Sequence, residues 1–334
     1  MLLILCLFLG SAGVIYLACE YFVNGVEWFG QKLKLGATAT GSVLAAFGTA
    51  LPESAVTFVA VMFGKTPAAR DIGVGAAMGG PLVLATIAYA VVGVALWCNQ
   101  RRLQRTDQII RVDHRRLARD QSWFLAIFVV KVGLGLVVFA FKPLLGVLFL
   151  AAYGVYVWRE MRSDDTAPEE EILEPLKLRP QQADPALRWV ATQTVAALVV
   201  IAAASRLFVS QLEAIGVALA LPPHLVALVL SPVATELPEA INALIWVRQG
   251  KERLALANIS GAMMVQATIP SSLALFATPW LFDAPLIVAG AVTAMAIVYL
   301  WWLFHRGRVE ARWLLPVGLL YGVFAFFVAW HFTG

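Results

Sequence analysis

Two short motifs that combine an acid with a proline lie inside otherwise apolar stretches, and they are the residues best suited to chemistry. The first motif, Gly48–Ser54 (GTALPES), carries Glu53, and the second, Ala234–Ala240 (ATELPEA), carries Glu239. A carboxylate inside a membrane span is costly and usually marks a functional site. Two of them in matching motifs predict one shared site for a positive ion.

The chemistry that these motifs offer is the binding of a hard cation. Proline has no N–H to donate, so each motif proline kinks its span and frees the carbonyl four residues earlier. Freed carbonyls are tolerated at membrane depth only where they are buried in protein or line a cavity. Ca²⁺ takes about six to eight oxygen ligands, and Glu53, Glu239, the groups of Thr49 and Thr235, and water would supply them.

Further polar residues accompany the second motif. Glu236 lies three residues before Glu239, and two neighbouring carboxylates in a low dielectric favour a proton on one of them unless a cation is bound. This arrangement suits the exchange of a cation for protons. In the apolar run 254–277, Asn258 and Gln266 share a helix face; they would either line an ion cavity or hydrogen-bond between helices. A single Glu–Pro pair would equally fit a kink with a hydrogen-bonded acid, but its duplication favours the ion site.

The elements that position these motifs are membrane helices. Of the 334 residues, 60% are hydrophobic and only 14% charged, with a mean hydropathy of +0.79, unlike soluble domains with roughly 25% charged residues. The apolar runs match the roughly 20 residues that a helix needs to cross a bilayer. The sequence predicts an all-α integral membrane protein with ten transmembrane helices. The predicted spans are 2–28, 36–63, 71–98, 121–141, 143–159, 189–213, 222–247, 254–277, 284–304 and 313–332.

The chain divides into two related halves. Residues 22–78 and 208–264 align without gaps with 19 identities in 57 positions, which indicates an internal duplication. The predicted domains are 1–159 (spans 1–5), an acidic and Pro-rich cytoplasmic linker 160–188 of flexible composition, and 189–334 (spans 6–10). Because five spans is an odd number, the second half must enter the membrane inverted, a common transporter design.

Basic residues set the predicted orientation. Twenty of the 25 Lys and Arg residues lie in loops after odd-numbered spans. The positive-inside rule places those loops in the cytoplasm and both termini outside the inner (plasma) membrane. The net charge of +4 therefore reflects topology and not nucleic-acid binding. The Arg-rich segment 101–120 would be either a surface helix or a solvated loop, and we expect Lys131 to play a structural role by snorkelling.

At the two motifs the chain resembles the sodium/calcium exchanger family of the cation/calcium antiporter superfamily, as an atypical member. The family carries a G-T-S-x-P-E motif in each of two inverted five-helix repeats, each followed by G-N-x-x-G-S-N. The resemblance implies ten helices with external termini. It also implies that Glu53 and Glu239 are the central Ca²⁺ ligands, joined by the carbonyls of Thr49 and Thr235.

The chain departs from the family pattern at the positions of sodium-binding side chains. The serine after the motif threonine is replaced by Ala50 in the first half and by Glu236 in the second. The later serine and amide positions hold the residues Ala76 and Gly80 in the first half, and Ala262 and Gln266 in the second. These departures favour H⁺ over Na⁺ as the coupling ion. For the Gly-rich run 73–80 we expect close helix packing.

The sequence thus predicts a secondary cation antiporter that works by alternating access. It would move a divalent cation, Ca²⁺ first, against H⁺ or Na⁺, as a monomer in the lipid bilayer and without a cofactor. The alternatives are a cation channel and a divalent-metal/proton exchanger that does not use Na⁺. An enzyme is disfavoured because no nucleophile–base pair is evident. The predicted ion-site residues are Glu53, Glu239, Thr49, Thr235, Glu236, Asn258 and Gln266.

Overall fold

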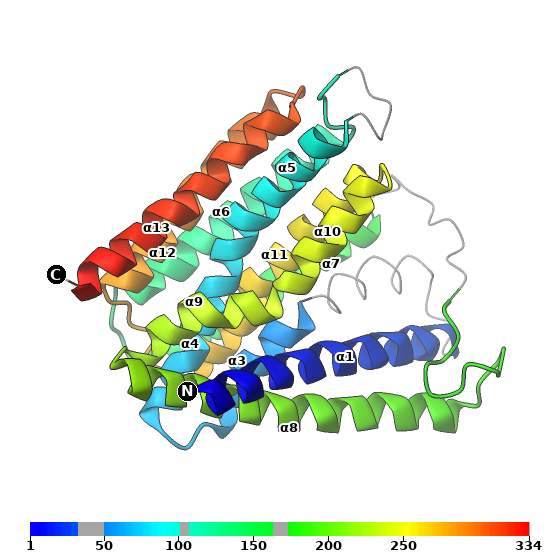
Figure 1. Ribbon diagram of the computed structural model, residues 1–334, viewed down its shortest axis with the longest axis horizontal. Helices are drawn as coiled ribbons and strands as arrows, with labels where there is room; N and C mark the ends of the chain where they lie inside the picture. Colours follow the sequence, from blue (N-terminus) through cyan, green and yellow to red (C-terminus); the bar gives the residue numbers. More distant parts are fainter. Residues whose placement is uncertain (33–49, 101–106, 163–172, 334) are drawn as a thin grey trace.

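The computed structural model describes residues 1–32, 50–100, 107–162 and 173–333 (Figure 1). Within these ranges the chain is all-helical, apart from an isolated antiparallel bridge between Ile109 and Glu310. Seven of the described helical segments are long and apolar enough to cross a membrane. The protein is therefore an all-α integral membrane protein, as the composition predicts. Gly48 and Thr49 of the first motif lie outside the described residues.

The described part of the chain consists of α-helices and short helical turns. In chain order they are α1 (Leu2–Lys32), α3 (Leu51–Phe63), α4 (Pro67–Val83), the π-helical turn η2 (Leu84–Ala88), α5 (Tyr89–Asn99), α6 (His114–Gly135), the 3₁₀ turn η3 (Lys142–Leu145), α7 (Gly146–Arg162), α8 (Leu187–Leu219), α9 (Pro223–Thr235), α10 (Leu237–Arg248), α11 (Glu252–Ala277), α12 (Ala284–His305), the 3₁₀ turn η4 (Ala311–Leu314) and α13 (Leu315–Thr333).

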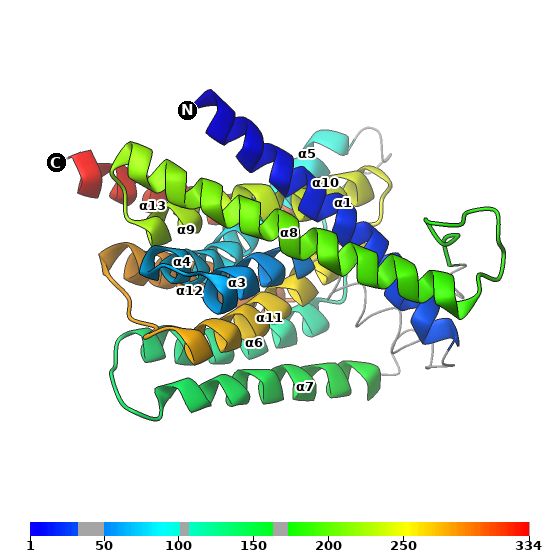
Figure 2. The same ribbon diagram turned by 90° about the horizontal axis from the view of Figure 1, so that it is seen from below.

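The two long helices α1 and α8 form one side of the molecule. They lie side by side and run in opposite directions, with the N-terminus of α1 beside the end of α8 that leads into α9 (Figures 1 and 2). Phe8 of α1 stacks on Phe208 of α8 with ring centroids 4.8 Å apart. Behind this pair, α3, α4, α9 and α11 form the buried centre, and α7 lies at the far edge against α11 (Figure 2).

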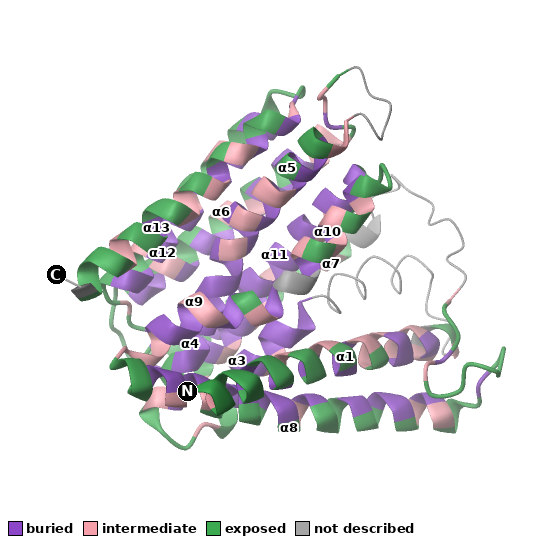
Figure 3. Cartoon of the chain, viewed as in Figure 1, coloured by how far each residue is buried: buried purple, intermediate pink, exposed green. Residues whose placement is uncertain are grey.

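Burial follows this layering. Buried residues are concentrated on the central helices, whereas exposed residues line the outer faces of α1, α8 and α13 (Figure 3). Many of the exposed residues are large and apolar, such as Leu198 and Val199 on α8 and Phe326 on α13. Outward-facing apolar side chains are what a helix needs against lipid.

Glycines allow α4 to approach α9 closely. A Cβ on Gly75 would lie 2.0 Å from the carbonyl oxygen of His224, and one on Gly79 would lie 2.5 Å from that of Leu228. Both contacts are with backbone atoms that cannot move aside. The expected packing role of the Gly-rich run is therefore confirmed at these two positions, and it joins the first half of the chain to the second.

The motif prolines start helices instead of kinking them. The predicted span 222–247 corresponds to one segment long and apolar enough to cross a membrane, Pro223–Arg248, but the expected kink is a break, because α9 ends at Thr235 and α10 begins at Leu237. Pro52 likewise lies in the first turn of α3. The first turn of a helix leaves its N–H groups unpaired in any case, so proline is well tolerated there. This break places the acid of each motif in the first turn of a new helix.

Two expectations for loops also need correction. Of the Arg-rich segment 101–120, residues 107–113 form an extended connection and residues 114–120 belong to α6, so the surface helix is wrong for the described part. Asp113 caps α6 by accepting the N–H of Arg116 at 3.0 Å, which lets the helix start earlier than predicted.

The second half of the linker is docked onto the helices. Leu176 is fully buried, and the backbone N–H of Lys177 donates to Asn24 Oδ1 on α1 at 3.1 Å. The indole of Trp28 donates to the carbonyl of Glu174 at 3.1 Å. The expectation of a flexible linker is therefore wrong for the described residues from 173 onward, because specific hydrogen bonds outweigh the polar, Pro-rich composition.

Candidate cation-binding site

The two motif acids are buried at the starts of their helices. Glu53 in α3 is 1% exposed and Glu239 in α10 is 2% exposed. A helix N-terminus carries a partial positive charge that stabilises a nearby carboxylate. Each half of the chain therefore presents one inward-facing acid from the first turn of a short helix, and neither acid faces lipid.

A threonine of the second half binds the acid of the first half. The Thr235 hydroxyl lies 2.7 Å from Glu53 Oε2, 3.1 Å from Glu236 Oε1 and 3.1 Å from the Ser231 carbonyl. One hydroxyl has a single proton to donate, so only one of these acceptors receives it at a time. Glu53, Thr235 and Glu236 therefore form one connected buried group that spans the two halves.

Glu236 interacts electrostatically with both motif acids, Glu53 and Glu239. It is itself 1% exposed. The side chain of Gln266 on α11 lies beside Glu236 without an ideal hydrogen bond. A Cβ on Gly80 would lie 2.5 Å from Gln266 Oε1, so the glycine on α4 makes room for this amide.

Several oxygen atoms of this group have no partner. Glu53 Oε1, Glu236 Oε2, Glu239 Oε2 and Gln266 Oε1 are buried and find no hydrogen-bond partner among the described residues. Leaving a buried acceptor unsatisfied costs roughly 1–3 kcal/mol, and more when it is charged. These acceptors are free to bind a cation or a proton donor.

The acids do not by themselves form a closed metal cage. Among the described residues no group of three or more His, Cys, Asp or Glu side chains is close enough to hold a metal ion. A divalent ion here would have to complete its shell with hydroxyls, carbonyls and water, and Pro238 leaves the Ala234 carbonyl at the end of α9 without its helical donor.

The other predicted site residues are less closely connected. Asn258 is half-buried on α11 with an unpaired Nδ2, and in the described part of the chain no hydrogen bond joins it to the three acids. Thr49 lies outside the described residues. Of the predicted set, Glu53, Thr235, Glu236, Glu239 and Gln266 are therefore brought together by the fold.

Lys131 and Asp120 are buried charged residues whose burial the sequence analysis did not predict. Lys131 on α6 is fully buried, and its ammonium donates to the Ala77 carbonyl of α4 at 2.7 Å, so the expectation that it snorkels is wrong. Asp120, also on α6, is 4% exposed and accepts from the Ser260 hydroxyl at 3.2 Å beside a small cavity of about 70 Å³. The signal that was available for Lys131 was its position within an otherwise apolar run.

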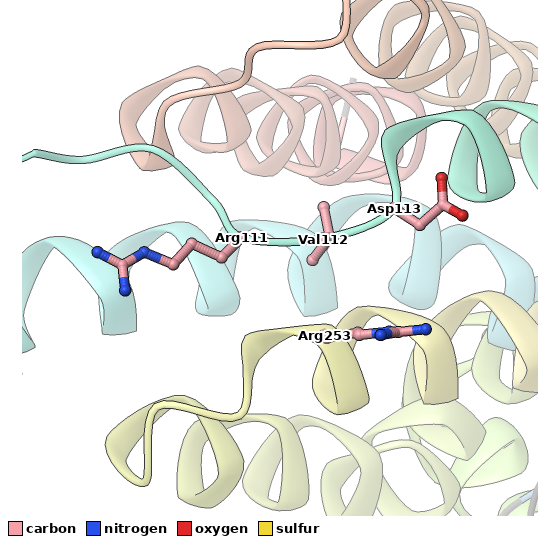
Figure 4. A pocket seen from close by; sticks show the side chains of 4 residues that line it. All are labelled: Arg111, Val112, Asp113 and Arg253. Carbon is pink, nitrogen blue, oxygen red and sulfur yellow. The ribbon is translucent and has the colours of Figure 1, made fainter. Parts of the chain in front are cut away.

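A larger pocket lies away from the acids. It has a volume of about 480 Å³ and is lined by Arg111, Val112, Asp113 and Arg253, at the ends of α6 and α11 (Figure 4). The side chains of Arg111 and Asp113 point away from each other in this view. Asp113 caps α6, and none of Glu53, Glu236 and Glu239 lines this pocket.

Buried acids at the starts of two short helices in an all-helical membrane protein are typical of a membrane transporter for cations. The model of the family described as sodium/calcium exchanger protein matches residues 3–161 and 189–332. The chain therefore belongs to the sodium/calcium exchanger family and is a membrane antiporter of that type. Members of this family are transporters and not enzymes.

Solved structures of exchangers share the fold. The crystal structure of the H⁺/Ca²⁺ exchanger CAX superposes with a TM-score of 0.75 at 17% identity, covering 96% of this chain and 81% of that one. A structure of the sodium-calcium exchanger NCX_Mj gives a TM-score of 0.59 at 18% identity and covers 97% of both chains. A search of curated proteins gives no significant match. At these identities the likeness is one of fold.

Proposed function

We propose that this antiporter carries Ca²⁺ across the inner membrane in exchange for H⁺, with Na⁺ as the alternative coupling ion. The observation that supports this most is the Thr235 hydroxyl, which links Glu53 of one half to Glu236 of the other. Glu53 and Glu239 are the principal ligands of the ion, and Thr235, Glu236 and Gln266 complete its surroundings. Thr49 and Asn258 are the remaining proposed members of the site.

The proposed architecture is ten helices in two inverted repeats, 1–159 and 189–334, joined by the cytoplasmic linker 160–188. The antiparallel pairing of α1 and α8 supports it, because these helices occupy corresponding places in the two halves. The excess of basic residues in alternate loops supports external termini. The protein would work as a monomer, since each chain holds both acids.

The coupling ion is proposed from the site and not from the fold. CAX and NCX_Mj are named for H⁺ and Na⁺ exchange respectively, and both share this fold, so the fold is compatible with either ion. Glu236 is an additional buried acid that interacts with Glu53 and Glu239. A third carboxylate in a dry site is readily neutralised by a proton, which favours H⁺.

The experiment that tests this proposal is flux into proteoliposomes, with the pH and Na⁺ gradients varied independently across a panel of divalent cations. We expect Ca²⁺ uptake that follows the pH gradient and persists without Na⁺. Uptake that requires a Na⁺ gradient would assign Na⁺ as the coupling ion. Uptake that responds to neither gradient would favour a channel and overturn the antiport mechanism for Ca²⁺.

A further inference from the structure

A buried lysine contacts the same stretch of α4 that contacts the acid group: Lys131 donates to the Ala77 carbonyl, and Gly80, three residues further on, faces Gln266. Lys131 is on α6, in the last turns of the helix among apolar neighbours, and it has no solvent exposure. Its ammonium interacts electrostatically with Glu53, although in the described structure no carboxylate oxygen lies close enough to form an ion pair with it. The charge is therefore near the ion site without occupying the acids themselves.

The fold provides a specific seat for this ammonium. Pro81 in α4 has no N–H, so the carbonyl of Ala77, four residues earlier, lacks its helical donor. The Lys131 ammonium donates to that carbonyl at 2.7 Å. The proline thus creates the acceptor that the lysine uses.

Aromatic residues complete the seat. The ammonium lies 5.6 Å from the ring centroid of Phe128 and 5.9 Å from that of Trp280. Aromatic faces stabilise a cation at such distances, more strongly when water is excluded. The indole of Trp280 also donates to the backbone carbonyl of Lys131 at 3.1 Å. The position of the lysine is therefore fixed by contacts that offset part of the cost of burying its charge.

We propose that Lys131 is a built-in counter-cation of the transport site, which sets how much positive charge the site takes from solution. The inference rests on the proposed function. Glu53, Glu236 and Glu239 together carry three negative charges when ionised, and with the positive charge of Lys131 the net charge of the empty site is −2. Net charge in hydrocarbon is expensive, so one divalent ion or two monovalent ions neutralise the site, and both forms cross the membrane without net charge.

Removing the lysine charge changes this balance by one. In Lys131→Met the net charge of the empty site becomes −3, which three monovalent ions neutralise but one divalent ion does not. Exchange of one Ca²⁺ for three monovalent ions moves one net charge per cycle. One charge crossing 100 mV changes the steady-state Ca²⁺ accumulation ratio about 50-fold.

The first test is Ca²⁺ accumulation in proteoliposomes at a clamped membrane potential. We expect the wild-type ratio to be independent of potential, and the Lys131→Met ratio to change by up to about 50-fold per 100 mV. Lys131→Arg keeps the charge and should behave as the wild type. Lys142→Met is the matched control, because Lys142 is also buried and donates to backbone carbonyls, of Val137 and Trp280, but lies in the turn η3. A Lys131→Met ratio that ignores potential overturns the proposal.

The second test needs binding only and covers a variant that folds but does not transport. Titration calorimetry with Ca²⁺ in Na⁺-free buffer should show at least about tenfold tighter binding by Lys131→Met, because a repelling charge is gone. If Lys131 has only a structural role, its removal should weaken Ca²⁺ binding. Weaker binding or an unchanged affinity would therefore overturn the inference. If the wild type neither binds nor exchanges Ca²⁺, the proposed function fails first. If the wild type binds and exchanges Ca²⁺ but Lys131→Met changes neither the potential dependence nor the affinity, the inference alone fails.

Discussion

Replacing Thr235 with valine removes the hydroxyl that joins the two halves and keeps the shape of the side chain. This hydroxyl is the donor to Glu53 Oε2 at 2.7 Å, and Glu53 Oε1 already lacks a partner. A hydrogen bond to a charged group contributes roughly 1.5–3 kcal/mol. We expect the ion-free protein to lose about that much free energy of unfolding, which is about a 10- to 150-fold change in the folding equilibrium.

The assay is thermal unfolding of the purified protein in detergent, with a chelator and then with Ca²⁺. Thr235→Val should unfold several degrees below the wild type in chelator, and Thr235→Ser should not. Ca²⁺ should recover most of the difference, because the cation then neutralises Glu53 in place of the hydroxyl. The matched control is Thr57→Val, since the Thr57 hydroxyl is buried one turn after Glu53 but has no partner.

Two results would refute this reasoning. The first is a Thr235→Val variant that unfolds together with the wild type in chelator, which would mean that the hydroxyl contributes nothing to the acid group. The second is a Thr57→Val variant that loses as much stability as Thr235→Val, which would make the loss a general effect of valine at buried threonines.

Further predictions concern the third acid and the helix packing. Glu236→Ala should change the pH dependence of Ca²⁺ uptake more than its Na⁺ dependence, and an unchanged pH profile would count against proton coupling. Gly75→Ala should destabilise the protein by at least about 1–3 kcal/mol, because its Cβ would lie 2.0 Å from the His224 carbonyl oxygen. Gly154→Ala, where a Cβ meets nothing within 4 Å, is the control for thermal unfolding; equal behaviour of the two variants would contradict the packing argument.

The duplicated motif was the strongest signal in the sequence. Apolar runs of membrane length predicted the helical class, and the offset of 186 residues between Glu53 and Glu239 predicted that both halves contribute to one site. The structure brings Glu53 and Glu236 within hydrogen-bonding distance of the Thr235 hydroxyl. Each motif is only about two helix turns long and places its own acid at the start of a helix, so recognising the motif and its repeat was sufficient to predict these acids.

What the sequence did not predict depends on partners distant in the chain. Pro238 was expected to kink a helix. Whether a proline kinks a helix or starts a new one depends on whether contacts with other helices hold the preceding residues out of helical conformation. Lys131 was expected to snorkel, as an isolated lysine in a membrane helix usually does. Its actual acceptor, the Ala77 carbonyl, lies 54 positions away on another helix and is free only because of Pro81.

The linker illustrates the same limit. Its composition predicts flexibility, yet the backbone N–H of Lys177 and the carbonyl of Glu174 hydrogen-bond to Asn24 and Trp28 on α1. Asn24 also accepts from Gln193 of α8 at 2.9 Å. Composition describes the average cost of ordering a segment, and a few specific buried hydrogen bonds are enough to reverse the outcome.

The central claim is that one acid from each half holds the same ion, and ⁴⁵Ca²⁺ exchange by Glu53→Gln, Glu239→Gln and the double variant tests it most directly. If both acids bind one ion, each single variant should abolish exchange to within background, and the double variant should be no worse, with all three still folded by thermal unfolding. Single variants that each retain a large part of the wild-type flux, with losses that multiply in the double variant, would contradict a shared site.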